Sequence, residues 1–258
     1  MLLAHCLDIN RLNLYLQHDR PLDKTELSDF KGLIKKRIQN QPVAYIIGEK
    51  GFFESDFLVT SDVLIPRPDT ETIVEQAIEI LKKDSKHKHK RKILELGTGS
   101  GAIIISLAKE ISDNSYFASD FSTAAIDIAK KNAERIANNE ISFFCSNWFL
   151  SLKGTAQFDL ILSNPPYIPS KDIAKLQPEI RKFEPMMALD GGNDGLDSYR
   201  IILQYAHSYL VPGGIILLEI GFDQKDGLIN IVNKLPQYQS MEFIKDLAGH
   251  NRVVLIKK

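Results

Sequence analysis

The sequence predicts an α/β protein in which a doubly wound, seven-stranded sheet follows a small N-terminal helical domain and a β-hairpin linker. From Lys92 onward, short apolar runs alternate with helical patterns, which is typical of a sheet built from strand, helix and strand units. A glycine-rich turn separates the first such strand from its helix, as in many ligand-binding folds of this kind. The length of 258 residues, with 44% hydrophobic residues, allows one large core and a small accessory unit.

The N-terminal part of the chain is predicted to be helical. Apolar residues recur there at helical spacing, namely Leu27, Phe30, Leu33, Ile34 and Ile38. From Gly51 to Pro68 the sequence changes to aromatic and β-branched residues with two prolines, which predicts a β-hairpin. A helix is then expected from Asp69 or Thr70 through Leu81. The predicted units are a helical domain (residues 1–50), a hairpin linker (51–68) and an α/β domain (69–258).

A charged segment, residues 82–92, leads into the first strand of the predicted sheet. It contains His87 and His89 among many lysines and has no periodicity, so we interpret it as a solvated connection. A contact with RNA or the ribosome is the alternative. A metal site at the two histidines is disfavoured because the neighbouring lysines repel a further cation.

Seven strands are predicted in the α/β domain, and three further helices follow the one through Leu81. The strands are Ile93–Leu96, Tyr116–Ser119, Ile141–Cys145, Phe158–Leu162, Ile215–Ile220, Met241–Ile244 and Arg252–Ile256. The helices are Ala102–Ile111, Ser122–Ile136, with Ser122 as its N-cap, and Asp197–Leu210. Ligands of such sheets bind at the carboxyl ends of the strands, and Gly97, Asp120 and Asn164 all fall there.

The glycine-rich turn reads Glu95-Leu96-Gly97-Thr98-Gly99-Ser100-Gly101. Glycines at this position let the backbone approach a ligand closely, and the start of the next helix presents free N–H donors. The pattern alone is weak evidence, because it also fits a dinucleotide-binding fingerprint. Asp120 even lies near the spacing of ~20 residues expected for an acid that binds ribose.

A second motif, Asn164-Pro165-Pro166-Tyr167, follows the fourth strand and is suited to hold a planar NH2 group. The Asn164 side-chain oxygen and the Pro165 carbonyl can each accept one N–H, and the proline rings fix these acceptors before a substrate arrives. Tyr167 is expected to cover one face of the planar NH2 group. Together with the glycine turn, this motif favours methyl transfer from S-adenosylmethionine to a nitrogen over nicotinamide chemistry.

Charge and composition exclude several classes of protein. A net charge of −1 lacks the global basic field on which non-specific DNA binding depends, so DNA is not an expected partner. The chain has neither a signal-like start nor a run approaching a membrane span, and we expect a cytoplasmic protein without a membrane partner. Cys6 and Cys145 have no metal-ligand spacing and are interpreted as buried thiols, and no metal is expected.

With these positions in place, the chain resembles the bacterial release-factor glutamine methyltransferases, the HemK/PrmC family, over nearly its whole length. An Asn-Pro-Pro-Tyr motif alone is shared with adenine-N6 methyltransferases, whereas the Leu64–Glu71 segment is much more restrictive. The resemblance rests on Gln41–Ile46 with Gly48, Leu64–Glu71, the glycine turn, Ser163–Ile168, Glu184-Pro185 with Ala188-Leu189, Gly191–Leu196 and Leu218–Gly221.

The resemblance implies a class I S-adenosylmethionine-dependent methyltransferase that modifies the glutamine of the Gly-Gly-Gln motif of peptide chain release factors. The catalytic residues would be Asn164, Pro165, Pro166 and Tyr167. By the same resemblance, Gly97, Thr98, Gly99, Ser100 and Gly101 would line the methionine portion of S-adenosylmethionine, Asp120 would bind both ribose hydroxyls, Trp148 would border the adenine, and Asn164 would also lie at the cofactor.

Three alternatives remain open: an adenine-N6 methyltransferase, a ribosomal-protein glutamine methyltransferase, and a non-catalytic cofactor-binding scaffold. The sequence departs from the family pattern in two places. Glu95 stands where the family often has Asp, which retains a carboxylate. The chain also begins near the expected second half of the helical docking domain, so we expect that domain to be shortened.

Overall fold

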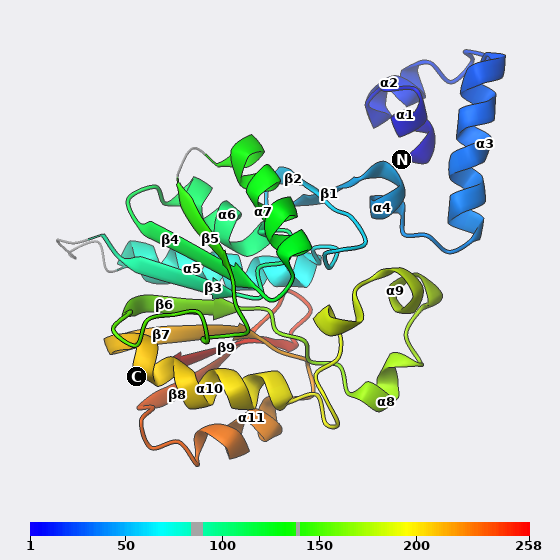
Figure 1. The fold of residues 1–258 in the computed structure, drawn as a ribbon. Coiled ribbons are helices and arrows are strands. Elements are labelled where there is room, and N and C mark those ends of the chain that lie inside the picture. Colours follow the sequence, from blue (N-terminus) through cyan, green and yellow to red (C-terminus); the bar gives the residue numbers. More distant parts are fainter. Residues whose placement is uncertain (84–89, 138–139) are drawn as a thin grey trace.

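The computed structural model describes residues 1–83, 90–137 and 140–258, and it consists of a small helical domain, a two-stranded hairpin and an α/β domain (Figure 1). Most of the charged segment 82–92, with His87 and His89, lies outside the described residues. Within the described ranges, no helix is both long and apolar enough to cross a lipid bilayer.

Four helices form the N-terminal domain. They are α1 (Leu2–Cys6), α2 (Arg11–Leu16), α3 (Lys24–Ile38) and α4 (Val43–Ile47). Helix α3 begins with a capping box, in which the Asp23 side chain accepts from Glu26 N–H and the Glu26 side chain accepts from Asp23 N–H. Helix α4 ends at Gly48, whose φ of 87° is the left-handed conformation that favours glycine.

The hairpin pairs β1 (Glu49–Phe52) with β2 (Ser55–Leu58) in antiparallel register. Beyond it, the chain runs without regular strand structure to the short helix η1 (Pro68–Thr70), which leads directly into α5 (Glu71–Lys83). Buried Asn132 fastens the hairpin to the α/β domain, because its side chain bonds to both the N–H and the C=O of Leu58 and to the carbonyl of Ser100.

The large sheet has the strand order β5-β4-β3-β6-β7-β9-β8. Its strands are β3 (Lys92–Leu96), β4 (Ser115–Asp120), β5 (Ile141–Cys145), β6 (Phe158–Ser163), β7 (Leu210–Glu219), β8 (Ser240–Lys245) and β9 (Asn251–Lys257). The strands from β5 to β7 are parallel, whereas β9 is antiparallel to both of its neighbours. The predicted doubly wound sheet is therefore confirmed, except that β7 begins at Leu210 and not at Ile215.

Helices cover both faces of the sheet (Figure 1). Helices α5, α6 (Ala102–Glu110) and α7 (Thr123–Ile136) lie on one face, and α10 (Asp197–Tyr209) and α11 (Lys225–Val232) lie on the other. Each face encloses a cluster of fully buried aliphatic and aromatic side chains. Ser122 caps α7 as predicted, since its hydroxyl accepts from Ala125 N–H at 3.2 Å.

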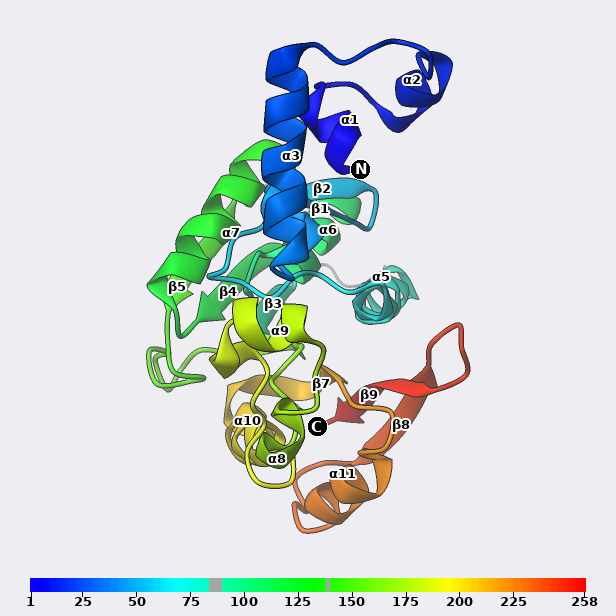
Figure 2. The same ribbon diagram turned by 90° about the vertical axis from the view of Figure 1, so that its right-hand side faces the viewer.

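Between β6 and α10 the chain forms a covering segment, residues 164–196, which contains α8 (Ser170–Ile173), α9 (Pro178–Phe183) and η2 (Met186–Ala188). Figure 2 shows α9 below the C-terminal end of α3. Two ion pairs hold this segment: Arg37 of α3 binds Glu179 at 2.5 Å, and Arg67 binds the buried carboxylate of Glu184. The covering segment thus contacts both the helical domain and the linker.

The two cysteines are not buried, contrary to the prediction. Cys6 is half-buried, and Cys145 is exposed. Cys145 is the last residue of β5, which is an edge strand of the sheet, so one side of its backbone has no neighbouring strand to cover it.

Candidate active site

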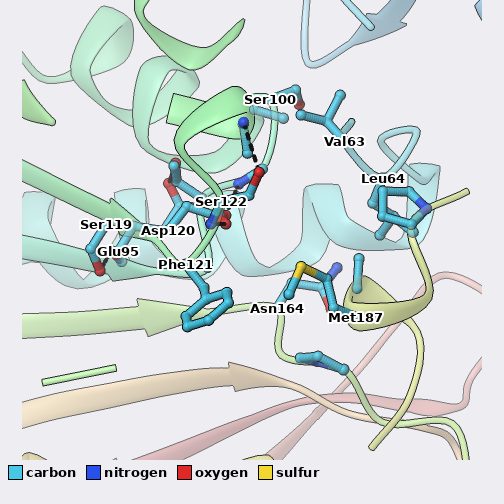
Figure 3. Close-up of a pocket in the computed structure, with 18 of the residues that line it drawn as sticks. Val63, Leu64, Glu95, Ser100, Ser119, Asp120, Phe121, Ser122, Asn164 and Met187 are labelled. Carbon is cyan, nitrogen blue, oxygen red and sulfur yellow. Dashed lines mark hydrogen bonds between the residues drawn. The ribbon is translucent and has the colours of Figure 1, made fainter. Parts of the chain in front are cut away.

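A cavity of about 420 Å³ lies at the carboxyl ends of β3, β4 and β6 (Figure 3). Strands β3 and β6 are neighbours, but the chain leaves β3 toward β4, so the strand order reverses between them. Their registers align Leu96 with Ser163, whose hydroxyl donates to the Leu96 carbonyl at 2.7 Å. The glycine turn and the Asn164 motif therefore leave the sheet side by side, at the switch point where such sheets bind ligands.

Five residues of the glycine turn line this cavity, namely Glu95, Gly97, Thr98, Gly99 and Ser100. Gly97 and Gly99 have φ values of 69° and 55°, and a Cβ added to either would meet open space. Gly101 has a different role, because its added Cβ would lie 2.5 Å from Ile105 in α6. It allows the turn to pack against the helix that it begins.

Glu95 stabilises the turn from inside the protein. Its carboxylate accepts from the Thr98 hydroxyl at 2.6 Å and from Ile104 N–H at 3.2 Å. Burial raises the pKa of Glu95 to about 8, although these two hydrogen bonds oppose the shift. The longer acid in place of Asp therefore joins the turn to the first turn of α6.

Asp120, at the end of β4, faces the cavity opposite the linker, as Figure 3 shows. Its two carboxylate oxygens accept from Gly99 N–H at 2.8 Å and from Ser122 N–H at 2.9 Å. A carboxylate has about four lone-pair sites, so it can still accept from a ligand. Burial raises the pKa of Asp120, and the backbone N–H groups partly offset that rise. Trp148 and Phe121 also line this end of the cavity.

Asn164 and Pro166 line the cavity, whereas Pro165 and Tyr167 of the same motif are not among its lining residues. Pro165 is buried, and burial beside the Glu219 carboxylate raises the pKa of the half-buried Tyr167 to about 12. The Tyr167 carbonyl accepts from Gln224 Nε2 at 2.9 Å, and a Cβ on Gly195 would come within 2.4 Å of the same oxygen. The motif's backbone is thus held by close packing of neighbouring loops.

Several cavity residues were not predicted from the sequence. They come from the linker and the covering segment and include Val63, Leu64, Pro66, Arg67, Thr70, Pro185, Met187, Ala188 and Asp190. Figure 3 shows Val63 and Leu64 across the cavity from Asp120, with Met187 beside Asn164. The restrictive Leu64–Glu71 motif is the sequence signal for four of them, Leu64, Pro66, Arg67 and Thr70.

These residues fit S-adenosylmethionine. The cavity volume falls within the range of small-molecule sites. The glycine turn offers backbone close to the ligand, Asp120 offers acceptors for hydroxyl groups, and Trp148 offers an aromatic surface. Across residues 1–83, 90–137 and 140–258, no group of three or more His, Cys, Asp or Glu side chains is arranged to hold a metal.

Two family descriptions match the chain. "Methyltransferase small domain" matches residues 70–180, and "PrmC N-terminal domain" matches residues 1–48. Two solved structures share the fold. A methyltransferase from Pyrococcus furiosus aligns with a TM-score of 0.52 at 24% identity, covering 89% of this chain and 98% of its own. The hMettl16 catalytic domain aligns with a TM-score of 0.57 at 14% identity, covering 93% of each chain.

The fold and the site together define a class I S-adenosylmethionine-dependent methyltransferase. Two relatives carry the name release factor glutamine methyltransferase. That of Geobacter sulfurreducens is 42% identical, covering 90% of this chain and 79% of its own length. That of Xylella fastidiosa strain Temecula1 is 44% identical, covering 98% and 90%. The chain belongs to the release factor glutamine methyltransferase family.

Proposed function

We propose that this chain transfers the methyl group of S-adenosylmethionine to the side-chain amide nitrogen (N5) of the glutamine in the Gly-Gly-Gln motif of peptide chain release factors. The observation that carries the proposal is the position of Asn164, which lines the same cavity as the glycine turn and Asp120. A group that can hold an amide therefore lies within the cavity that fits the methyl donor. The names of the relatives supply the identity of the acceptor protein.

The proposed chemistry depends on position and electrostatics. An amide nitrogen is a poor nucleophile because its lone pair is delocalised into the carbonyl. If Asn164 Oδ1 and the Pro165 carbonyl each accept one N–H, they turn the nitrogen toward the methyl group and stabilise the positive charge that develops on it. The methylated nitrogen becomes acidic and loses its proton late, so no dedicated base is required.

S-adenosylmethionine supplies the methyl group as a sulfonium, and the reaction releases S-adenosylhomocysteine. In this proposal the residues from Gly97 to Gly101 hold the methionine portion, Asp120 holds the ribose and Trp148 borders the adenine. Of these, Gly97, Thr98, Gly99 and Ser100 line the cavity and would contact the cofactor directly. Gly101 would act through the turn's shape, because it packs on Ile105.

The release factor is proposed as the protein substrate, and the N-terminal helices as the surface that grips its body. Those helices expose several large apolar side chains, Leu12, Tyr15, Leu16 and Ile38 among them. A second contact away from the reacting glutamine raises its effective concentration at the site. The proposal also places the reaction in the cytoplasm, as the sequence predicts.

A titration with radiolabelled S-adenosylmethionine tests this function. Equal concentrations of release factor, duplex DNA, RNA and ribosomal protein are offered to the wild-type chain. Label in the release factor alone is the expected result. Label in nucleic acid would identify an adenine-N6 enzyme, label in ribosomal protein would identify the other glutamine enzyme, and cofactor binding without any transfer would indicate a scaffold.

A further inference from the structure

Asn164 must present its oxygen, and not its NH2 group, to a substrate amide. The two ends of an asparagine side chain have nearly the same shape, so something must fix which end faces the cavity. Asn164 Nδ2 lies 3.3 Å from Thr70 Oγ1 and donates to it. Among the described residues, none donates to Asn164 Oδ1, which is therefore free to accept from a ligand.

Thr70 also lies beside a buried acid. Its side chain is almost fully buried at the edge of the cavity, and its hydroxyl is near enough to the carboxyl group of Glu219 to lower the pKa of that acid. Strand register brings this acid to the site: Ser163 of β6 pairs with Leu218 of β7, so Glu219 follows beside Asn164. Glu219 is 1% exposed, and its Oε2 has no hydrogen-bond partner in the part of the chain that the structure describes.

The direction of each hydrogen bond between Glu219, Thr70 and Asn164 follows from the ionised state of Glu219. A carboxylate only accepts, so the Thr70 hydroxyl must donate its one proton to Glu219. Thr70 Oγ1 then has only lone pairs left to offer, and these match the NH2 end of Asn164. The reverse orientation would place Asn164 Oδ1 against Oγ1, with no proton between two acceptors.

We propose that Thr70 and Glu219 are positioning residues for methyl transfer: the buried acid polarises the Thr70 hydroxyl, and that hydroxyl fixes the Asn164 amide with its oxygen toward the substrate. The inference rests on the proposed function, since it assigns these two residues to the same site. Neither residue is catalytic by this account. Thr70 acts through Asn164, and Glu219 acts through Thr70.

The same arrangement predicts a dependence on pH. Burial raises the pKa of Glu219 to about 7, and Thr70, Arg252 and Tyr167 oppose that rise, whereas Asp69 adds to it. When Glu219 is protonated it can itself donate to Thr70. The Thr70 hydroxyl is then free to donate to Asn164, and the orientation of the Asn164 amide is no longer fixed. Turnover should therefore fall as the pH decreases through about 7.

The groups around Glu219 come from three elements and from the loop after β6. Asp69 belongs to η1, Arg252 to β9, Tyr167 follows β6, and Tyr199 of α10 donates to the Glu219 backbone carbonyl at 2.9 Å. The pKa values of both tyrosines are raised by burial, so both remain neutral near pH 7. Arg252 stays charged there. Burial thus brings the pKa of Glu219, and of neither tyrosine, close to neutral pH.

The test compares Thr70→Val, Thr70→Ser and Glu219→Gln with the wild type on intact release factor. Ser106→Ala is the matched control, because Ser106 Oγ is also buried but has no hydrogen-bond partner among the described residues. We expect Thr70→Val to lower kcat about tenfold while the Kd for S-adenosylmethionine stays within about twofold. Thr70→Ser and Ser106→Ala should keep kcat within about twofold of the wild type.

A spectroscopic measurement supplies a readout besides activity. The side-chain NH2 resonances of Asn164 are followed by NMR from pH 5.5 to 8.5 in the wild type and in Glu219→Gln. The wild-type signals should shift with a midpoint near 7, and this shift and the acidic fall of kcat should both disappear in Glu219→Gln.

Each outcome separates this inference from the proposed function. A wild type that does not methylate release factor overturns the function. An active wild type with an equally active Thr70→Val, or with Thr70→Ser as impaired as Thr70→Val, overturns the positioning role alone. Persistence of the NMR shift in Glu219→Gln overturns the role of Glu219 even if Thr70→Val does not fold.

Discussion

The α/β domain and the N-terminal helical domain differ in how far each buries its own helices. Seven of the nine residues of α6 are buried, whereas none of the fifteen residues of α3 is. In the α/β domain, Gly97, Asp120 and Asn164 follow or end strands that are anchored in its core, and the linker and the covering segment complete the cavity. The helical domain exposes several of its large apolar residues and is joined to the rest by contacts such as Arg37–Glu179 and Tyr45 to the Val63 carbonyl.

This difference suggests a division of labour. The α/β domain would carry out the chemistry on any glutamine that reaches the cavity, and the helical domain would select the protein that presents it. Three predictions test that division, and a fourth concerns the stability of the glycine turn inside the α/β domain. They follow from the largest expected effect to the smallest.

Replacing Asn164 should have the largest effect on turnover. Asn164→Ala removes a preorganised acceptor for the substrate amide, and we expect kcat to fall by about a hundredfold or more. The Kd for S-adenosylmethionine, measured by calorimetry, should change little. A parallel loss of cofactor affinity and rate would contradict the assignment of Asn164 to the substrate.

Substitutions at Asp120 and in the glycine turn should change the affinity for S-adenosylmethionine. Asp120→Ala removes charged acceptors, and we expect it to weaken S-adenosylmethionine binding by about tenfold or more. Gly99→Val should also weaken binding, because a β-branched side chain at a φ of 55° strains the turn and its Cβ would enter the cavity. Unchanged Kd values for both variants would mean that the cofactor binds elsewhere.

Removing the helical domain should separate the two roles. A chain without residues 1–41 should lose about tenfold in kcat/KM on intact release factor. Its slow reaction on a short Gly-Gly-Gln peptide should persist, provided that circular dichroism shows a folded α/β domain. Equal losses on protein and peptide would contradict a docking role for these helices.

The smallest expected effect concerns stability. Glu95 has a pKa of about 8 in the folded chain, above its unfolded value, so its contribution to stability is present at low pH and is lost as the pH rises through about 8. The Tm should therefore fall between pH 6 and pH 9. Glu95→Gln keeps acceptors for Thr98 and Ile104 but cannot ionise, so its Tm should fall by a few degrees less. An identical decrease in both proteins would contradict this effect.

The sequence predicted the sheet because hydrophobic periodicity is a local signal. The start of β7 was missed, since Val211-Pro212-Gly213-Gly214 looks like a turn although Leu210 already pairs with Phe158. The cysteines were misassigned because free cysteine is usually buried, whereas Cys145 ends an edge strand.

Motifs located the residues at the site, but they did not predict how the side chains contact one another. Gly97, Asp120 and Asn164 were placed at strand ends, and the structure brings all three to one cavity. The contact of Asn164 with Thr70 joins residues 94 positions apart and depends on how the linker crosses the sheet. Glu219 reaches the site only through the pairing of β6 with β7. No spacing in the sequence encodes either relationship.

The most direct measurement is to locate the transferred methyl group on intact release factor by mass spectrometry, using wild-type chain and Asn164→Ala with S-adenosylmethionine. The account predicts one methyl group on the side-chain nitrogen of the Gly-Gly-Gln glutamine with the wild type, and almost none with the variant. A methyl group at another residue, or equal methylation of the glutamine by both proteins, would contradict it.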